Sequence, residues 1–463
     1  MTFPIYLISS ALSLMAPVEQ KAAPTPNIIF IYCDDLGYGD LSAYGSIWNK
    51  TPELDKMATE GIRFTDFYAG APVCTPSRTG LLTGSYARRV DMDRDAKGRW
   101  VLFPVAKKGI NPAETLLPEA LKTSNYATAM IGKWHLGDQP EFNPTRHGFD
   151  YWYGIPYSND MEVVNRGDPP LPLMENEKVI EQYGAHKEFD QSTLTQKYTE
   201  KAIEWIDANK KKPFFLYLAH TMPHNPVAAR PDFYENTNNP KKGFGACVAE
   251  ISWSTGEILD YLRKENLDKN TLVVFTSDNG GNPRWGASNG ILRGQKGQTY
   301  EGGVRVPFIA WYPGKIKPGG VCNHPASVID MFETLTTLAG AKVRDNVVRD
   351  GKDITDYLFD PDKEQPPRPF YYWHFGSLEA VRYGNWKLQL AGKFSRVSRD
   401  GPELYDLQAD PGETINVAGD NREMVELITD FADKHKQSLG ERENAGPEVR
   451  KTILVEDPKP VLK

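Results

Sequence analysis

One short segment of the chain combines residue types that fit nucleophilic chemistry at a helix terminus. Cys74 opens residues 74–84, which read CTPSRTGLLTG. Thr75 is a residue type favoured at a helix N-cap and Pro76 suits the first helical position, so a helix is predicted to start beside the cysteine. The free N–H groups of its first turn would favour an anion there. The alternative is a buried structural cysteine.

The spacing CxPSR followed by LLTG resembles the maturation signature of the type I sulfatases, in which this cysteine is oxidised to formylglycine. The resemblance runs from about Asn27 to Pro307 and continues more weakly to the end of the chain. Residues 289–294 and 310–314 are most similar to the branch that contains arylsulfatase A and N-acetylgalactosamine-6-sulfatase. The resemblance implies a sulfuric ester hydrolase.

Four apolar, β-rich runs predict buried strands, and each is followed by polar residues. The runs cover residues 27–33, 127–132, 214–218 and 272–276, and the polar clusters are Asp34-Asp35, Lys133 to His135, His220 to His224 and Asp278-Asn279. A further run covers residues 306–310, and helical stretches such as 118–124 and 248–265 alternate with the strands. This alternation predicts an α/β fold with a mostly parallel sheet. In such sheets the carboxyl ends of neighbouring strands share one crevice, so the four clusters should meet.

The domain organisation follows from changes in composition and hydrophobic pattern along the sequence. Residues 1–23 resemble a secretory signal peptide, because an apolar stretch too short to span a bilayer precedes a polar Pro/Ala segment. Residues 24–365 would form the catalytic α/β domain, for which the resemblance implies an alkaline-phosphatase-like core with helices flanking the sheet. Residues 366–463 have short aromatic strand patterns and a last helix near 421–439, which predict a smaller domain with an antiparallel sheet and a helix.

Four of the strand-end residues offer hard oxygen ligands. Asp34, Asp35, Asp278 and Asn279 bring neither sulfur nor imidazole, which suits Ca²⁺, or less well Mg²⁺, better than zinc. Adjacent acidic residues after a strand could instead cap a helix. The resemblance favours the metal site and adds Cys74, in its oxidised form, to the ligand set.

Several basic residues match positions of the family. Lys133 and His135 share one face of an extended backbone, His224 ends the segment that follows a buried strand, and Lys296 precedes the run EGGVRVP. Each has an ordinary alternative, because single histidines are often core residues and lysines in loops are usually solvated. The resemblance implies that Lys133, His224 and Lys296 bind the sulfate group.

The resemblance also implies a reaction sequence. The aldehyde at Cys74 would be hydrated to a geminal diol, and one hydroxyl, activated by the metal and by Asp278 as a base, would attack sulfur. His224, with Lys296 nearby, would protonate the departing alkoxide. His135 would then take the proton of the second hydroxyl, so that sulfate leaves and the aldehyde returns. Arg78 would orient the formylglycine oxygens.

Composition limits the partners and the location. The 463 residues carry a formal net charge of −7 with no basic footprint, so a nucleic-acid partner is not expected, and neither is a membrane span. The signal-like segment predicts export to a periplasm or the extracellular space, or to a lysosome in a eukaryote. Four cysteines are too sparse for a disulfide scaffold. The resemblance adds a formylglycine-generating maturation enzyme as a partner, and the oligomeric state stays open.

The substrate is expected to be a sulfated saccharide or an aryl sulfate. Six loop residues could line the pocket for the leaving group or could serve only loop packing: Arg146, His147, Tyr157, Asn159, Asp160 and Trp285. Two other functions compete with the sulfatase hypothesis. A phosphonate ester hydrolase would use the same nucleophile, and a catalytically silent protein would use the cationic pocket only to hold sulfated glycans.

Overall fold

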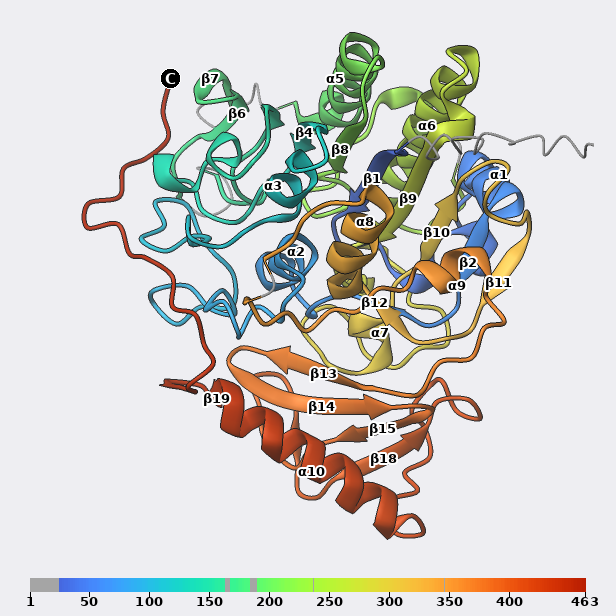
Figure 1. The fold of residues 1–463 in the computed structure, drawn as a ribbon, viewed down its shortest axis with the longest axis vertical. Coiled ribbons are helices and arrows are strands. Elements are labelled where there is room, and N and C mark those ends of the chain that lie inside the picture. Colours follow the sequence, from blue (N-terminus) through green and yellow to red (C-terminus); the bar gives the residue numbers. More distant parts are fainter. Residues whose placement is uncertain (1–24, 163–166, 184–189, 236, 345) are drawn as a thin grey trace, which may run out of the picture.

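The computed structural model describes residues 25–162, 167–183, 190–235, 237–344 and 346–463 (Figure 1). The predicted signal peptide, residues 1–23, lies outside the described residues. No described helix is long and apolar enough to cross a membrane. The four cysteines, Cys33, Cys74, Cys247 and Cys322, are all buried free thiols.

A ten-stranded sheet forms the centre of the larger part of the molecule. Its strands, in spatial order, are β11 (Gly320–Cys322), β2 (Ile62–Phe64), β10 (Phe308–Trp311), β9 (Thr271–Ser277), β1 (Asn27–Cys33), β8 (Phe214–Ala219), β4 (Ala127–Gly132), β5 (Tyr151–Gly154), β6 (Leu171–Glu175) and β7 (Lys178–Tyr183). The five strands from β9 to β5 are parallel to one another. The predicted, mostly parallel sheet is confirmed.

Strand β10 departs from this parallel core. It pairs antiparallel with both β9 and β2, and it begins at Phe308 because Pro307 has no N–H for the ladder. The run predicted as a strand over residues 306–310 therefore exists in part, but its carboxyl end points away from the edge where the parallel strands end.

Both faces of the sheet are buried under helices. Strand β1 shows this best: Ile28, Phe30 and Tyr32 pack on one face, while Ile29 and Ile31 pack on the other. The first face is covered by α2 (Cys74–Thr83), α3 (Leu117–Lys122) and α8 (Met331–Ala339). The second is covered by α1 (Pro52–Glu60), α5 (Leu194–Asn209) and α6 (Lys242–Lys264) (Figure 1). This double cover explains why the central strands are continuous apolar runs.

Helix α6 begins six residues before the predicted start at Val248. The added turn contains Gly243 and Gly245, which lower helix propensity and hide the helix in the sequence. A side chain at Gly245 would collide with Thr237, since its Cβ would lie 2.0 Å from the Thr237 hydroxyl oxygen. Close packing, rather than propensity, therefore sets this end of the helix.

The C-terminal part forms a four-stranded antiparallel sheet with its own core. Its strands are β13 (Pro369–His374), β14 (Ser377–Tyr383), β15 (Trp386–Gln389) and β18 (Glu403–Asp406), and α10 (Arg422–Leu439) packs across the sheet (Figure 1). The predicted antiparallel sheet and final helix are confirmed. After β19 (Gly440–Glu441) and β20 (Asn444–Ala445) the chain returns along the larger part, where the Lys459 backbone N–H donates to Gln139.

Several short elements complete the fold. They are β3 (Phe67–Tyr68), which pairs with β12 (Ala326–Ser327), β16 (Gly392–Lys393), which pairs with β17 (Ser398–Arg399), β19 (Gly440–Glu441), which pairs with β20 (Asn444–Ala445), and the helices α7 (Glu301–Val304) and α9 (Thr355–Phe359).

Candidate active site

The polar clusters that follow β1, β4, β8 and β9 lie at one edge of the sheet. These four strands are adjacent in the order β9, β1, β8, β4, and all run parallel. In register, Cys33 of β1 lies opposite Ser277 of β9, and Gly132 of β4 lies opposite Ala219 of β8. The residues that follow these positions therefore enter one crevice, as expected from the sequence.

Cys74 enters this crevice from the first turn of α2. The helix begins at Cys74 with Val73 as its N-cap, so the prediction that Thr75 caps the helix and Pro76 starts it was wrong. The Ser77 N–H donates to the Val73 carbonyl at 3.2 Å, which closes the first turn two residues earlier than expected. The Thr75 hydroxyl instead donates to the His135 carbonyl at 3.1 Å and ties the helix to the loop after β4.

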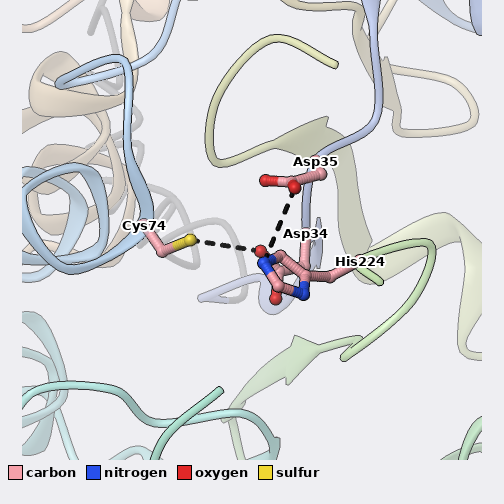
Figure 2. Close-up of side chains that lie close together, drawn as sticks. All are labelled: Asp34, Asp35, Cys74 and His224. Carbon is pink, nitrogen blue, oxygen red and sulfur yellow. Dashed lines mark hydrogen bonds and ion pairs between the residues drawn. The ribbon is translucent and has the colours of Figure 1, made fainter. Parts of the chain in front are cut away.

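The Cys74 thiol points at the carboxylates that follow β1 (Figure 2). Its Sγ lies 3.4 Å from Oδ1 of Asp34, to which the thiol donates. Burial, reinforced by the charge of Asp34, raises the pKa of the Cys74 thiol far above its usual range. An unmodified Cys74 is therefore a protonated thiol and a weak nucleophile.

Three carboxylates and three cations form the ionic part of the site, which we call the site cluster: Asp34, Asp35, Asp278, Arg78, Lys133 and Lys296. Nζ of Lys133 lies 2.5 Å from Asp34 Oδ2, and Nζ of Lys296 lies 2.7 Å from Asp35 Oδ1. Arg78 donates from both Nε and Nη2 to Asp278 Oδ2, at 3.0 and 2.8 Å. Each buried carboxylate thus has its own cation.

The carboxylates of this cluster have pKa values displaced in opposite directions. Burial would raise the pKa of Asp34, but the charges of Lys133, His224 and Arg78 hold it well below its usual value. Burial and the neighbouring charge of Asp34 raise the pKa of Asp278 to about 7. One carboxylate therefore stays ionised while its neighbour can accept a proton near neutral pH, which is typical of functional sites.

The oxygen donors of the crevice fit a hard divalent cation. Oδ1 of Asn279 is buried and has no hydrogen-bond partner among the described residues, while its Nδ2 donates to Asp35 Oδ1 at 2.8 Å. Ligand atoms of Asp34, Asp35, Cys74 and His224 all lie within 4.8 Å of one another. The carboxylate and amide oxygens of Asp34, Asp35 and Asn279 are of the kind that Ca²⁺ and Mg²⁺ prefer, whereas the Cys74 thiol and the His224 imidazole are softer donors.

His224 lies beside this donor set, with a fixed ring orientation. Its Nδ1 faces the side-chain oxygen of Asn159 at 3.0 Å and the carbonyl oxygen of Asn225 at 2.6 Å. Both oxygens are acceptors, so Nδ1 carries a proton and Nε2 faces Asp35 Oδ2 at 3.6 Å (Figure 2). Burial and the charge of Lys296 lower the pKa of His224. The lowered pKa favours the neutral ring relative to a histidine in water.

His135 lies under the start of α2. Its Nε2 contacts the Leu102 carbonyl oxygen at 2.9 Å, so Nε2 must be the protonated nitrogen of the neutral ring. Its Nδ1 is buried without a hydrogen-bond partner among the described residues. Burial and the charge of Lys133 hold the pKa of His135 well below its usual value. The ring is thus a neutral base with one free acceptor.

The six loop residues divide into two groups. Asn159 contacts His224, and the charges of His224 and Lys133 help to lower the pKa of Asp160, which burial alone would raise. The other four serve packing or the surface: Arg146 pairs with Glu177, His147 is buried against Trp134, the Tyr157 hydroxyl donates to the Pro170 carbonyl, and Trp285 lies under the Arg284 guanidinium. His220 is also a core residue, next to Ser254.

Sequence reasoning missed two contacts of this site. Ser158 accepts a hydrogen bond from Lys133 Nζ at 3.1 Å, and Asn159 was considered only as a pocket residue rather than as the group that holds His224. Both follow β5, a short aromatic strand that is parallel to β4 and ends at the same edge. The strand-end argument would have found them if residues 151–154 had been recognised as a strand.

Comparisons with known proteins identify the family to which the chain is similar. The family model described as Sulfatase matches residues 26–341, and the model described as N-sulphoglucosamine sulphohydrolase, C-terminal, matches residues 295–440. The chain is 37% identical over 475 residues to N-acetylgalactosamine-6-sulfatase of Mus musculus, covering 94% of this chain and 90% of that protein. It is 36% identical over 440 residues to arylsulfatase A of Homo sapiens, covering 86% and 84%. The crystal structure of Ps i-CgsB in complex with k-i-k-neocarrahexaose superposes with a TM-score of 0.77 at 30% identity, covering 89% of this chain and 92% of that one.

Proposed function

The chain belongs to the sulfatase family and is a sulfuric ester hydrolase, and on this premise we propose that it removes sulfate from a sulfated carbohydrate. We also propose that Cys74 is oxidised to formylglycine by a maturation enzyme and that a calcium ion completes the site. The observation that carries the proposal is the position of Cys74. It is the first helical residue of α2 and its thiol donates to Asp34. The ammonium groups of Lys133 and Lys296 pair with Asp34 and Asp35 beside it.

The properties of Cys74 support its conversion. A buried thiol with a raised pKa cannot supply a nucleophile at neutral pH. The aldehyde made from it, once hydrated, would supply a hydroxyl nucleophile at the same place. Asp34, Asp35, Asp278 and Asn279 would hold the calcium ion, which would supply positive charge beside that nucleophile. Arg78, fixed by two hydrogen bonds to Asp278, would orient the oxygens at position 74.

The sulfate group would be bound by cations that already face the crevice. Lys133 and Lys296 present ammonium groups beside Cys74, and Ser158 fixes the first of them at 3.1 Å. Positive groups arranged before the reaction offset the charge that builds on the sulfate oxygens as the ester bond breaks. A sulfate ester carries one negative charge and therefore fits a position beside these two ammonium groups.

Two histidines would move the protons. Nε2 of His224 is the nitrogen left free by Asn159, and the negative charge of a bound sulfate ester would raise the pKa of His224, so that this nitrogen can hold a proton for the departing oxygen. Nδ1 of His135 would accept the proton of the second hydroxyl at position 74, because burial keeps that ring neutral. Asp278, with its raised pKa, would act as the base for the attacking hydroxyl.

A carbohydrate substrate is supported by the relatives. N-acetylgalactosamine-6-sulfatase of Mus musculus is named for a sulfated sugar, and the structure of Ps i-CgsB holds a neocarrahexaose. We further propose that the chain is exported, because residues 1–23 carry a signal-like pattern.

The test uses protein produced with and without a formylglycine-generating enzyme. We expect the matured sample to show the mass loss of thiol-to-aldehyde conversion in the peptide that contains Cys74, and to release sulfate from one or more members of a panel of sulfated saccharides. A chelator should abolish turnover, and added Ca²⁺ should restore it. Higher turnover of a phosphonate ester would favour the competing hydrolase, and binding of saccharides without turnover by the matured sample would favour a silent binding protein.

A further inference from the structure

The entrance of the active site lies beside Lys296 and His224. Their side chains keep exposures of 17% and 11%, whereas those of Asp34, Arg78 and Lys133 are fully buried. A substrate larger than its sulfate group must therefore extend past Lys296. The next residue, Gly297, donates its backbone N–H to the Pro72 carbonyl at 2.8 Å, which ties this loop to the segment before Cys74.

Two side chains cover Gly297. A Cβ built on this residue would lie 3.4 Å from Cζ3 of Trp100 and 3.1 Å from Nε of Arg396. The Arg396 guanidinium stacks on the Trp100 ring, with Cζ 4.4 Å from the ring centroid. Trp100 belongs to the catalytic part of the chain, and Arg396 to the turn between β16 and β17 of the C-terminal part. The two parts thus meet at the entrance.

The guanidinium of Arg396 is exposed and has no carboxylate partner among the described residues, and its stacking contact with Trp100 holds its plane. Arg399, in the same hairpin, is the opposite case: it is buried, lies over the Tyr300 ring and points at Glu403. Arg399 and the Phe394 N–H, which donates to the Val397 carbonyl at 2.9 Å, fix the hairpin. Arg396 is therefore held in position with its donors still available.

Space for a further group exists beside this pair. His374, whose ring centroid lies 6.3 Å from that of Trp100, lines a cavity of about 250 Å³ next to this pair, although neither Trp100 nor Arg396 lines it. Ser395, the neighbour of Arg396 in the chain, lines the cavity, and so do Arg94 and Glu443, which form an ion pair at 2.6 Å. Nε2 of His374 is buried and has no hydrogen-bond partner among the described residues. Aromatic and cationic groups next to a cavity suit a sugar ring that bears an anionic substituent.

We propose that Trp100 and Arg396 form a subsite for the sugar unit next to the one that loses its sulfate, and that Arg396 binds a carboxylate or sulfate group on that unit. The proposal rests on the carbohydrate sulfatase function proposed above. A planar guanidinium held by a ring presents paired N–H donors that match both oxyanions. The subsite makes the C-terminal part a determinant of specificity rather than only a support.

Binding to the inactive full-length Cys74→Ala protein tests the proposal by calorimetry. The probes are two disaccharides in which N-acetylgalactosamine 6-sulfate is linked either to glucuronic acid or to glucose. We expect the charged neighbour to improve Kd by about tenfold, and Arg396→Ala to remove this preference. Arg396→Lys should keep part of it, because the charge remains but the planar fork is lost. Lys393→Ala, which removes a charge from the same hairpin, is the matched control and should keep all of it.

The outcomes separate the two proposals. Binding of both probes without a preference, or equal losses in the Arg396 and Lys393 variants, would overturn the subsite and leave the carbohydrate function standing. Failure of both probes to bind, together with no release of sulfate from any member of the saccharide panel by the matured enzyme, would overturn both. A disaccharide with a sulfated, otherwise neutral neighbour shows whether the subsite accepts sulfate as well as carboxylate. In the matured enzyme, Arg396→Ala should leave turnover of 4-nitrophenyl sulfate unchanged; a comparable loss there would mean that Arg396 only supports the Lys296 loop.

Discussion

Two buried ionic clusters of the same formal composition have different roles in this molecule. The site cluster contains three carboxylates and three cations. A second set, which we call the interdomain cluster, also has three of each: Asp66, Glu301, Glu413, Arg305, Arg382 and Lys387. It joins α7 and the segment after β2 to the C-terminal sheet. Both sets are buried, except that the side chain of Lys296 in the site cluster keeps an exposure of 17%.

The clusters differ in the groups that surround them. In the interdomain cluster every carboxylate oxygen has a partner, and neutral groups complete the set: the Tyr68 hydroxyl donates to Glu301 at 2.7 Å and Gln389 Nε2 donates to Glu413 at 3.0 Å. Among the described residues, the site cluster adjoins two buried acceptors without partners, Asn279 Oδ1 and His135 Nδ1, whereas the interdomain cluster adjoins the unpartnered Tyr372 hydroxyl, over whose ring Lys387 lies. A free amide oxygen and a free imidazole nitrogen are atoms to which a metal ion and a proton can bind, and this separates the site cluster from one that only joins two parts.

The largest effect is expected at Cys74, the proposed nucleophile beside the site cluster. Cys74→Ala should lower kcat by at least about 10³-fold, because no other described residue offers the reacting atom. The melting temperature should change little, since the thiol makes one long hydrogen bond to Asp34. Sulfate release and thermal unfolding measure the two effects.

A second buried free cysteine provides the matched control. Cys247 lies in α6, in the core on the other side of the sheet. Cys247→Ala should leave kcat within about twofold of the original and lower the melting temperature slightly through a small cavity. An active Cys74 variant, or a Cys247 variant without turnover, would contradict the assignment of the nucleophile.

Lys133 in the site cluster and Lys387 in the interdomain cluster both have fully buried side chains, so the same substitution at each compares the two clusters directly. Lys387→Met leaves Glu301 and Glu413 without their shared cation, so the free energy of unfolding should fall by about 3–5 kcal/mol. The folded fraction should keep its kcat. Lys133→Met should instead lower kcat/KM by about 10²–10³-fold, because the sulfate loses a positive group.

Denaturant titration and initial rates on the same two variants check this pair of predictions. In calcium-loaded protein the stability loss of Lys133→Met should be the smaller one, since Asp34 keeps Arg78 nearby at 3.8 Å. Equal stability losses together with equal rate losses would show that the two clusters do not differ in role.

The site was more predictable from sequence than the interdomain cluster, for a topological reason. Four members of the site cluster, Asp34, Asp35, Lys133 and Asp278, directly follow parallel strands and are brought together by the sheet itself. Arg78 lies in α2 and Lys296 in the loop before α7, and both were found through the family resemblance. The interdomain cluster draws Asp66, Glu301 and Lys387 from segments with no shared position in a repeating unit. Its long-range pairing leaves no local pattern, so Glu301 was noticed only as a companion of Lys296.

The errors in the predicted elements have similar causes. The start of α2 was placed two residues late because Thr75 and Pro76 fit the local preferences for a cap, whereas Val73 supplies the first helical acceptor through its carbonyl. Residues 151–154 are too few to give a strand signal, so the polar residues that follow them were not linked to the site. In both cases tertiary contacts overrode or hid the local signal.

A smaller effect is expected at His224, which is proposed to act on the leaving group rather than on the nucleophile. His224→Ala should lower kcat on a saccharide sulfate by about 100-fold, because an alkoxide needs a proton to depart. On 4-nitrophenyl sulfate the loss should stay below about tenfold, since nitrophenolate is stable without that proton. Parallel kinetics on the two substrates measure the difference, and equal losses would remove His224 from the role of acid.

The smallest effect is expected at Asn159, which acts only through His224. Asn159→Ala removes the oxygen that accepts from Nδ1, while the Asn225 carbonyl at 2.6 Å still holds the same proton. We therefore expect about a tenfold loss of kcat on the saccharide sulfate, little change in KM, and no change on 4-nitrophenyl sulfate. Asn159→Asp keeps an acceptor oxygen and should recover most of the rate. A loss of the same size on both substrates, without recovery by Asp, would mean that Asn159 supports the loop through Gln191 and does not position the acid.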